Sequence, residues 1–182
     1  MCRLGLNGFD KVYSFGSYEG NLRELIHLFK FSGITTLAKP FGNFLRQALP
    51  REAGFDVIVP MPLHWTKRYS RGYNQSQLLS KEISKVWKIP VRNVVRRVRR
   101  TEAQAGLSSA QRRLNVRAAF RARAKHNVTG LSILLVDDVL TTGATASACA
   151  RELKRAGAAH VALLTLARRD RRNPTAQLGR EQ

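Results

Sequence analysis

The sequence has few acidic residues, almost no cysteine and no long apolar run, and each shortage excludes a class of protein. Only 12 Asp and Glu residues face 32 Lys and Arg, which gives a formal net charge of +20 and implies an anionic partner. Two cysteines cannot form a disulfide framework, so the expected compartment is a reducing cytoplasm. No apolar run reaches the roughly 18 residues of a transmembrane helix, and the first residues lack the apolar core of a signal peptide.

What remains is typical of one compact domain with a real core. The chain has 182 residues, and 43% of them are apolar, which argues against general disorder despite the charge. Hydrophobic periodicity predicts helices and short apolar strands in alternation. The expected helices cover 21–31, 35–49, 75–87 and 142–156, and the expected strands cover 56–59, 94–98, 131–136 and 160–166.

The best-defined unit lies in the C-terminal half. The continuous apolar run 131–136 is typical of a strand buried on both faces of a parallel sheet. A turn, a helix over 142–156, Gly157 as its stop and the strand 160–166 follow, and together they make a βαβ unit. The sequence therefore predicts an α/β fold.

The turn of this unit carries the chemistry. The strand is expected to end in Asp137 and Asp138, at the edge of the sheet where α/β proteins bind ligands. The free N–H groups at the start of the next helix, with several threonine hydroxyls, should hold a phosphate. Carboxylates beside a phosphate site would instead grip sugar hydroxyls or Mg²⁺, so a ribose 5-phosphate unit fits both ends. The predicted phosphate-loop residues are Thr141, Thr142, Gly143, Ala144 and Thr145.

The segment Ile133–Thr145 resembles the phosphoribosyl pyrophosphate motif of the type I phosphoribosyltransferases. The resemblance implies that Asp137 and Asp138 hold the ribose 2′- and 3′-hydroxyls, and that the threonine loop holds the 5′-phosphate. The alternative is an ordinary strand-to-helix turn in which Asp and Thr only cap the helix.

A second candidate loop follows the strand 56–59. It places Lys67, Arg68 and Arg71 close together, and it should emerge at the same edge of the sheet. Such a loop could grip a pyrophosphate. The alternative is a solvated basic loop without a ligand.

Several short patterns together resemble a narrower family. They are P-M-P-L-H from Pro60, R-G-Y-N-Q from Arg71, and R-T followed by Gln104. With the acidic motif, they resemble the competence protein F (ComF, GntX-like) family over about residues 13–168. This implies a type I phosphoribosyltransferase fold, with a mostly parallel central sheet flanked by helices and a small N-terminal hood.

The chain departs from that family at its start. Members usually begin with a four-cysteine zinc ribbon, but here only Cys2 remains and Gly5 stands where its partner would be. We therefore expect no zinc, a remnant of the ribbon region over 1–12, and a polar tail over 169–182.

The resemblance also implies a flexible loop that closes over the pyrophosphate. Arg99, Arg100, Thr101 and Gln104 are its candidates, and an exposed turn without a special role is the alternative. Closure would exclude water from an electrophilic sugar.

Two functions stay open at this point. The resemblance implies binding of phosphoribosyl pyrophosphate with Mg²⁺, no metal ligands from the protein alone, and phosphoribosyl transfer to an unknown nitrogen nucleophile, a glycosyltransferase reaction. The alternative is a competence factor that handles incoming single-stranded DNA during DNA uptake, together with other competence proteins. Eleven cations against one acid over 92–125 favour a nucleic-acid-binding surface, with Arg96 and Arg97 as candidates. An Arg-rich composition can also reflect a GC-rich genome.

Overall fold

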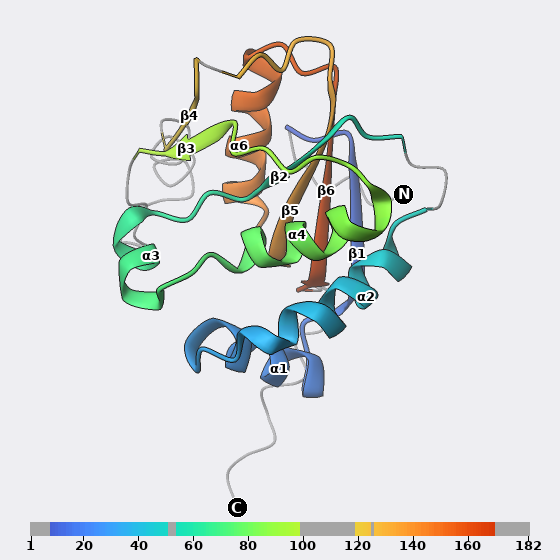
Figure 1. Cartoon of the computed structure of the whole chain (residues 1–182), viewed down its shortest axis with the longest axis vertical. Helices are drawn as coiled ribbons and strands as arrows, with labels where there is room; N and C mark the ends of the chain where they lie inside the picture. The colour runs from blue at the N-terminus through green and yellow to red at the C-terminus, as the bar shows by residue number, and fades with distance from the viewer. Residues whose placement is uncertain (1–7, 51–53, 99–118, 125, 170–182) are drawn as a thin grey trace, which may run out of the picture.

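The computed structural model describes residues 8–50, 54–98, 119–124 and 126–169, without the side chains of Lys67, Arg68 and Ser70. Strands and helices alternate along most of the chain (Figure 1). The elements are β1 (Lys11–Ser17), α1 (Gly20–Phe31), the 3-10 turn η1 (Thr35–Leu37), α2 (Ala38–Ala48), β2 (Val57–Pro60), α3 (Trp65–Arg71), α4 (Gln75–Trp87), β3 (Val95–Arg97), β4 (Phe120–Ala122), β5 (Ser132–Leu140), α6 (Ala144–Arg155) and β6 (His160–Arg168).

Four parallel strands form the central sheet, in the order β1-β6-β5-β2. Parallel neighbours need long connections, and those of this sheet contain helices. The short strands β3 and β4 pair antiparallel in a separate two-stranded sheet. The expected α/β class, with a parallel central sheet flanked by helices, is confirmed.

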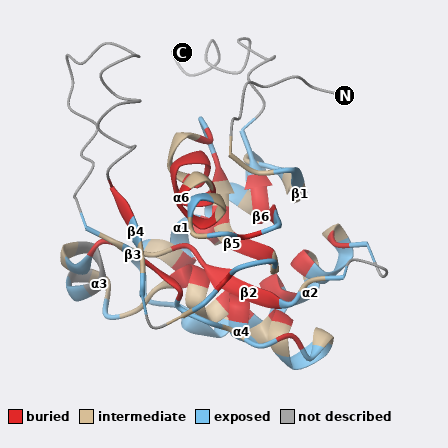
Figure 2. Cartoon of the chain, turned by 90° about the horizontal axis from the view of Figure 1, so that it is seen from above, coloured by how far each residue is buried: buried red, intermediate tan, exposed pale blue. Residues whose placement is uncertain are grey.

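The sheet separates two apolar cores, because successive strand residues point to opposite faces. Ile133 and Leu135 of β5 pack on one side with α6 and the β3–β4 pair. Leu134 and Val136 pack on the other side with α1, α2 and α4. Figure 2 shows the buried residues in the sheet and in the helix faces that turn toward it.

The topology defines where a ligand can bind. After β2 the chain enters α3 and α4, whereas after β5 it enters α6 on the opposite face of the sheet. In open α/β sheets, ligands bind at the carboxyl ends of two such strands. Helix α1 lies beyond these ends (Figure 1), in the region where the sequence predicts a hood.

Some predicted boundaries are correct and others are wrong. Helix α4 has the predicted bounds, and α1 begins one residue earlier than predicted, at Gly20. The sequence predicts an apolar strand over 131–136 that ends in the two acids, but β5 continues past both acids to Leu140. Helix α6 begins at Ala144 instead of position 142, because Gly143 still belongs to the turn.

The sequence analysis missed three elements. Strand β1 lies at the edge of the sheet and is half-exposed, so its pattern carries little apolar signal. Helix α3 forms within the predicted basic loop and has only seven residues, and its described side chains include the exposed Trp65 and Tyr69. Strand β4 has only three residues. Among the described helices, none is both long and apolar enough to cross a membrane.

The contact between α2 and α4 gives the first testable prediction. A Cβ atom at Gly42 would lie 2.6 Å from the Cβ of Glu82. Ala normally stabilises a helix relative to Gly, but here the added methyl group must push two packed helices apart. We expect Gly42→Ala to lower the free energy of unfolding by about 1–3 kcal/mol in urea denaturation.

A matched substitution on the same helix is Gln47→Ala, because Gln47 is exposed. It should change the free energy of unfolding by less than about 0.5 kcal/mol. Stabilisation of the protein by Gly42→Ala would contradict the close approach of α2 and α4 at Gly42.

Candidate functional site

The turn between β5 and α6 offers free backbone donors. Gly143 caps α6 with a φ of 75°, a left-handed conformation that favours glycine. The N–H of Ala144 donates to Thr142 Oγ1 at 3.4 Å. Among the described residues, none accepts a hydrogen bond from the N–H of Thr145 or Ala146. These groups form a helix N-terminus that can bind an anion.

A small open pocket of roughly 100 Å³ lies at this turn. Asp137 borders it together with the loop, so Asp137 and the two residues with free amides, Thr145 and Ala146, line the same space. Ala144 and Asp138 do not belong to the described lining. The lining residues are Asp137, Val139, Leu140, Thr141, Thr142, Gly143, Thr145, Ala146, Leu163 and Thr165.

The carboxylate of Asp137 is held by α4. Its Oδ1 accepts a hydrogen bond from Ser76 Oγ at 3.1 Å and from the N–H of Asp138 at 2.9 Å. Removal from water, together with the charge of Asp138, raises the pKa of Asp137 to about 7, although Lys30 acts in the opposite direction. Sequence reasoning missed Ser76, although its place at the start of a helix predicted at this edge was a signal.

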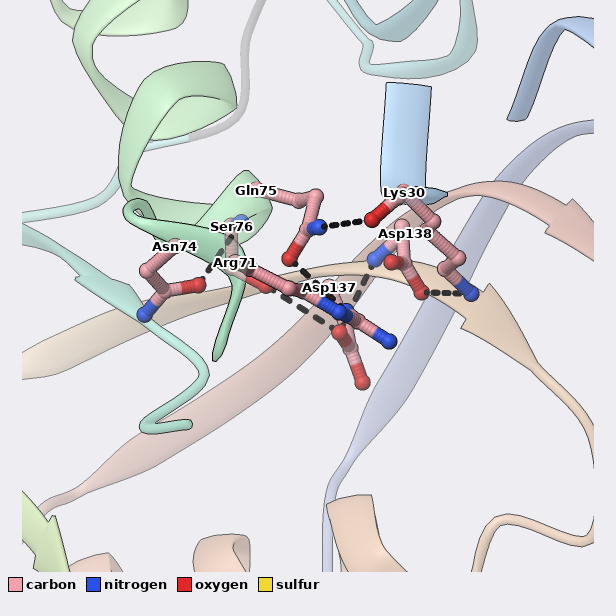
Figure 3. A network of polar contacts seen from close by, with 7 residues as sticks. All are labelled: Lys30, Arg71, Asn74, Gln75, Ser76, Asp137 and Asp138. Atoms are coloured by element: carbon pink, nitrogen blue, oxygen red, sulfur yellow. Dashed lines mark hydrogen bonds and ion pairs between the residues drawn. The ribbon is translucent and has the colours of Figure 1, made fainter. Parts of the chain in front are cut away.

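The carboxylate of Asp138 turns to a different partner. Its Oδ1 lies 2.9 Å from Nζ of Lys30, in the last turn of α1, and both side chains are mostly buried. Figure 3 shows Asp138 turned toward Lys30 and Asp137 turned toward Ser76. Neighbouring strand residues point to opposite faces, so the two acids do not share one orientation. Sequence reasoning assigned Lys30 no role, although it lies in the Leu28–Phe31 stretch.

The R-G-Y-N-Q segment contacts the end of α1. The hydroxyl of Tyr73 donates to the carbonyl of Phe29, and Nε2 of Gln75 donates to the carbonyl of Lys30 at 3.4 Å. Nη1 of Arg71 donates to Oε1 of Gln75 at 3.1 Å (Figure 3). The guanidinium of Arg71 also lies 4.9 Å from the ring centre of Phe31.

This segment therefore supports α1 in the structure, a role that the sequence analysis did not predict. Asn74 caps α4 through its side chain, which accepts from the N–H of Ser76 at 3.1 Å, and it donates to the carbonyl of Met61 at 3.0 Å. The role of Arg71 as a pyrophosphate ligand stays a prediction. The side chains of Lys67 and Arg68 lie outside what the structure describes.

The two candidate nucleic-acid arginines differ from each other. Arg96 is exposed, whereas Arg97 is half-buried with its guanidinium 5.6 Å from the ring centre of Phe120. Burial lowers the pKa of the Arg97 guanidinium, and the negative charge of Asp137 opposes this shift. The candidates for the flexible loop, Arg99, Arg100, Thr101 and Gln104, lie outside the described residues.

A parallel sheet, a paired-acid strand and a free-amide loop define a phosphoribosyltransferase-like domain, and residues 70–177 match the family model described as phosphoribosyl transferase domain. Competence protein F of Haemophilus influenzae is 35% identical over 169 residues, which cover 88% of this chain and 73% of that protein. The chain belongs to the competence protein F family.

Other comparisons give further similar proteins. DNA utilization protein YhgH of Escherichia coli is 34% identical over 170 residues, which cover 88% of this chain and 73% of that protein. Among solved structures, glutamine phosphoribosylpyrophosphate amidotransferase from Bacillus subtilis aligns with a TM-score of 0.49 and 22% identity. That alignment covers 71% of this chain and 26% of the amidotransferase chain.

The raised pKa of Asp137 predicts a dependence of stability on pH. Between the ordinary pKa of 3.8 and about 7, the folded state keeps a proton that the unfolded state has lost, so the free energy of unfolding falls as pH rises. Asp137→Asn cannot ionise, and its amide oxygen can still accept both hydrogen bonds. We expect the variant to be more stable than the wild type by about 1–3 kcal/mol at pH 8, and by little at pH 4, in urea denaturation.

Asp10→Asn is a control of opposite sign. Burial alone would raise the pKa of Asp10, but Lys154 and the N–H of Val161 outweigh burial and lower it. The stability that Asp10 contributes is therefore present above its ordinary pKa and lost in acid, so this variant should be less stable at neutral pH. A lower free energy of unfolding for Asp137→Asn than for the wild type at pH 8 would contradict the raised pKa of Asp137.

Proposed function

We propose that this chain binds phosphoribosyl pyrophosphate and transfers its phosphoribosyl group to a nitrogen nucleophile. The observation that carries the proposal is one pocket lined both by Asp137 and by Thr145 and Ala146, whose N–H groups have no acceptor among the described residues. A ligand there needs an anionic end for the amides and hydroxyls for the carboxylate, and a ribose phosphate has both. Membership of the phosphoribosyl transferase domain family supports the same ligand.

The residues would divide the ligand among them. The loop from Thr141 to Thr145 would hold the 5′-phosphate, and Asp137 with Asp138 would hold the ribose hydroxyls. Arg71, with the basic residues predicted at 67–68 and 99–104, would attract the pyrophosphate. Transfer would break the bond between C1 and the pyrophosphate oxygen while the nitrogen forms a bond to C1, so the protein mainly orients two reactants.

The site fits Mg²⁺ only if the ion arrives with the ligand. Among the described residues, no group of three or more His, Cys, Asp or Glu side chains could hold a metal. Mg²⁺ is often bound by one or two carboxylates together with substrate phosphates and water, which suits a site with two acids. When bound, the ion would neutralise charge on the departing pyrophosphate.

Isothermal titration tests the proposal directly. Phosphoribosyl pyrophosphate with Mg²⁺ should bind the wild type, and Thr145→Val should weaken binding by roughly tenfold, because a hydrogen bond to a charged group is lost. Thr36→Val, at an exposed position of η1, is the matched control and should bind normally. Pyrophosphate release with a panel of bases and amines would then identify transfer. No binding at millimolar ligand would contradict the proposal.

A second candidate function, handling of single-stranded DNA, rests on the β3–β4 pair. Arg96 lies directly opposite Arg121 across the two strands, and both are exposed. Like charges in that position repel each other, and a bound phosphate would relieve the repulsion. Trp65 and Tyr69 on α3 are 72% and 91% exposed, and such aromatic faces can stack on bases. The names of the relatives, competence protein F and DNA utilization protein, agree with this partner.

Fluorescence anisotropy with a labelled single-stranded oligonucleotide tests this second function. Arg96→Glu and Arg121→Glu should each weaken binding and reduce the slope of log affinity against log salt by about one. Lys11→Glu changes the charge equally on β1, at the opposite edge of the central sheet from β2, and should have a smaller effect. Equal effects of all three variants would mean that net charge alone governs binding.

A further inference from the structure

Both acids of the site are anchored in the same way. Asp137 receives its two hydrogen bonds on Oδ1, and Asp138 binds Lys30 through Oδ1. Within the part of the chain that the structure describes, Oδ2 of neither carboxylate has a protein partner. Both Oδ2 atoms are accessible to water, because a fully buried oxygen without a partner would leave an unsatisfied polar atom, and neither Oδ2 is such an atom. Each carboxylate is fixed by one oxygen and leaves the other available.

The backbone at Lys30 is itself held by contacts with neighbouring segments. Its carbonyl accepts from Gln75, and the carbonyl before it, that of Phe29, accepts from Tyr73. The ring of Phe29 is fully buried and packs edge-on against Phe41 at 5.2 Å. The ammonium group thus reaches Asp138 from a backbone that these three contacts hold. Figure 3 shows one of them, the hydrogen bond from Gln75 to the carbonyl of Lys30, together with the ion pair of Lys30 and Asp138.

The burial of this ion pair argues against a purely stabilising role. The side chains of Lys30 and Asp138 are only 18% and 12% exposed. Removing two charges from water costs free energy that their attraction often does not recover, and a well-packed apolar pair is often at least as stable. A buried pair whose second carboxylate oxygen stays accessible is better explained by the orientation that it gives to that oxygen.

We propose that Lys30 is a positioning residue of the ligand site, which fixes Asp138 through Oδ1 so that Oδ2 is presented to a hydroxyl of the bound sugar phosphate. Ser76 does the same for Asp137. The R-G-Y-N-Q segment, Arg71–Gln75, holds Lys30 in register with β5. This inference rests on the proposed function, since it requires a ligand with sugar hydroxyls.

The test compares two probes by isothermal titration. Ribose 5-phosphate carries the hydroxyls, and inorganic phosphate does not. Lys30→Met should weaken ribose 5-phosphate binding by roughly tenfold while inorganic phosphate binding changes little, because the loop that holds phosphate is untouched. Lys30→Arg, which keeps the charge, should restore much of the affinity. The matched control is Lys85→Met, because Lys85 is also ion-paired but lies on α4, with Glu82 as its partner. This variant should bind both probes normally.

A double-mutant cycle separates positioning from a general effect of charge. If Lys30 acts through Asp138, then Lys30→Met should cause no further loss of ribose 5-phosphate affinity in an Asp138→Asn background. This double variant also leaves no unpaired buried charge. Should Lys30→Met alone unfold, Tyr73→Phe loosens the end of α1 while keeping the ion pair, and it should weaken ribose 5-phosphate binding selectively.

Three outcomes would overturn the inference alone. The first is an equal loss of affinity for ribose 5-phosphate and inorganic phosphate in Lys30→Met. The second is that the losses of affinity from Lys30→Met and Asp138→Asn add in the double variant. The third is unchanged or tighter ribose 5-phosphate binding in Lys30→Met. Failure of the wild type to bind either ribose 5-phosphate or phosphoribosyl pyrophosphate would overturn the proposed function as well.

Discussion

Two adjacent carboxylates near the end of a buried strand are the constraint around which the rest of the chain is arranged. Charges withdrawn from water are costly unless they are hydrogen-bonded or paired. The start of α4 supplies Ser76 to Asp137, and the end of α1 supplies Lys30 to Asp138. Polar contacts at the acids therefore join the start of α4 and the end of α1 to the same strand, and apolar packing fills the space behind them. Asp137 borders the pocket at the start of α6, whereas Asp138 turns toward α1, which packs on the opposite face of the sheet.

The sequence predicted the elements whose pattern is set by local burial. Helix α4 places Leu79 and Ile83 in the core at helical spacing, and the prediction of its bounds is confirmed. Strand β5 continues past its predicted end, because its polar residues do not interrupt the pairing with β6, which extends to Leu140. Strand β1 and helix α3 were missed because an exposed edge and a short, mostly polar helix leave little apolar periodicity to detect.

The candidate site was predictable where its residues follow one another. The loop and Asp137 come from one contiguous stretch, and the structure places them around one pocket. Partners from distant segments were not predictable in this way, because Ser76 lies 61 positions from Asp137 and no local pattern connects them. The basic segment before α4 shows the same limit. Its charge suggested a ligand, but its contacts with Phe29 and Lys30 became visible only once α1 was packed against it.

The order of strands has a consequence for the synthesis of this protein. In the described sheet, β1 pairs only with β6, and Ser14 reaches its hydrogen-bond partner Thr165 across 151 positions. At about 5–20 residues per second, a ribosome needs roughly 8–30 s to travel that distance. During this interval the first strand has no neighbour, and its open edge can pair with other chains. Completion of the sheet therefore waits for nearly the whole domain to be translated, and a nascent chain stalled before β6 exposes an aggregation-prone edge.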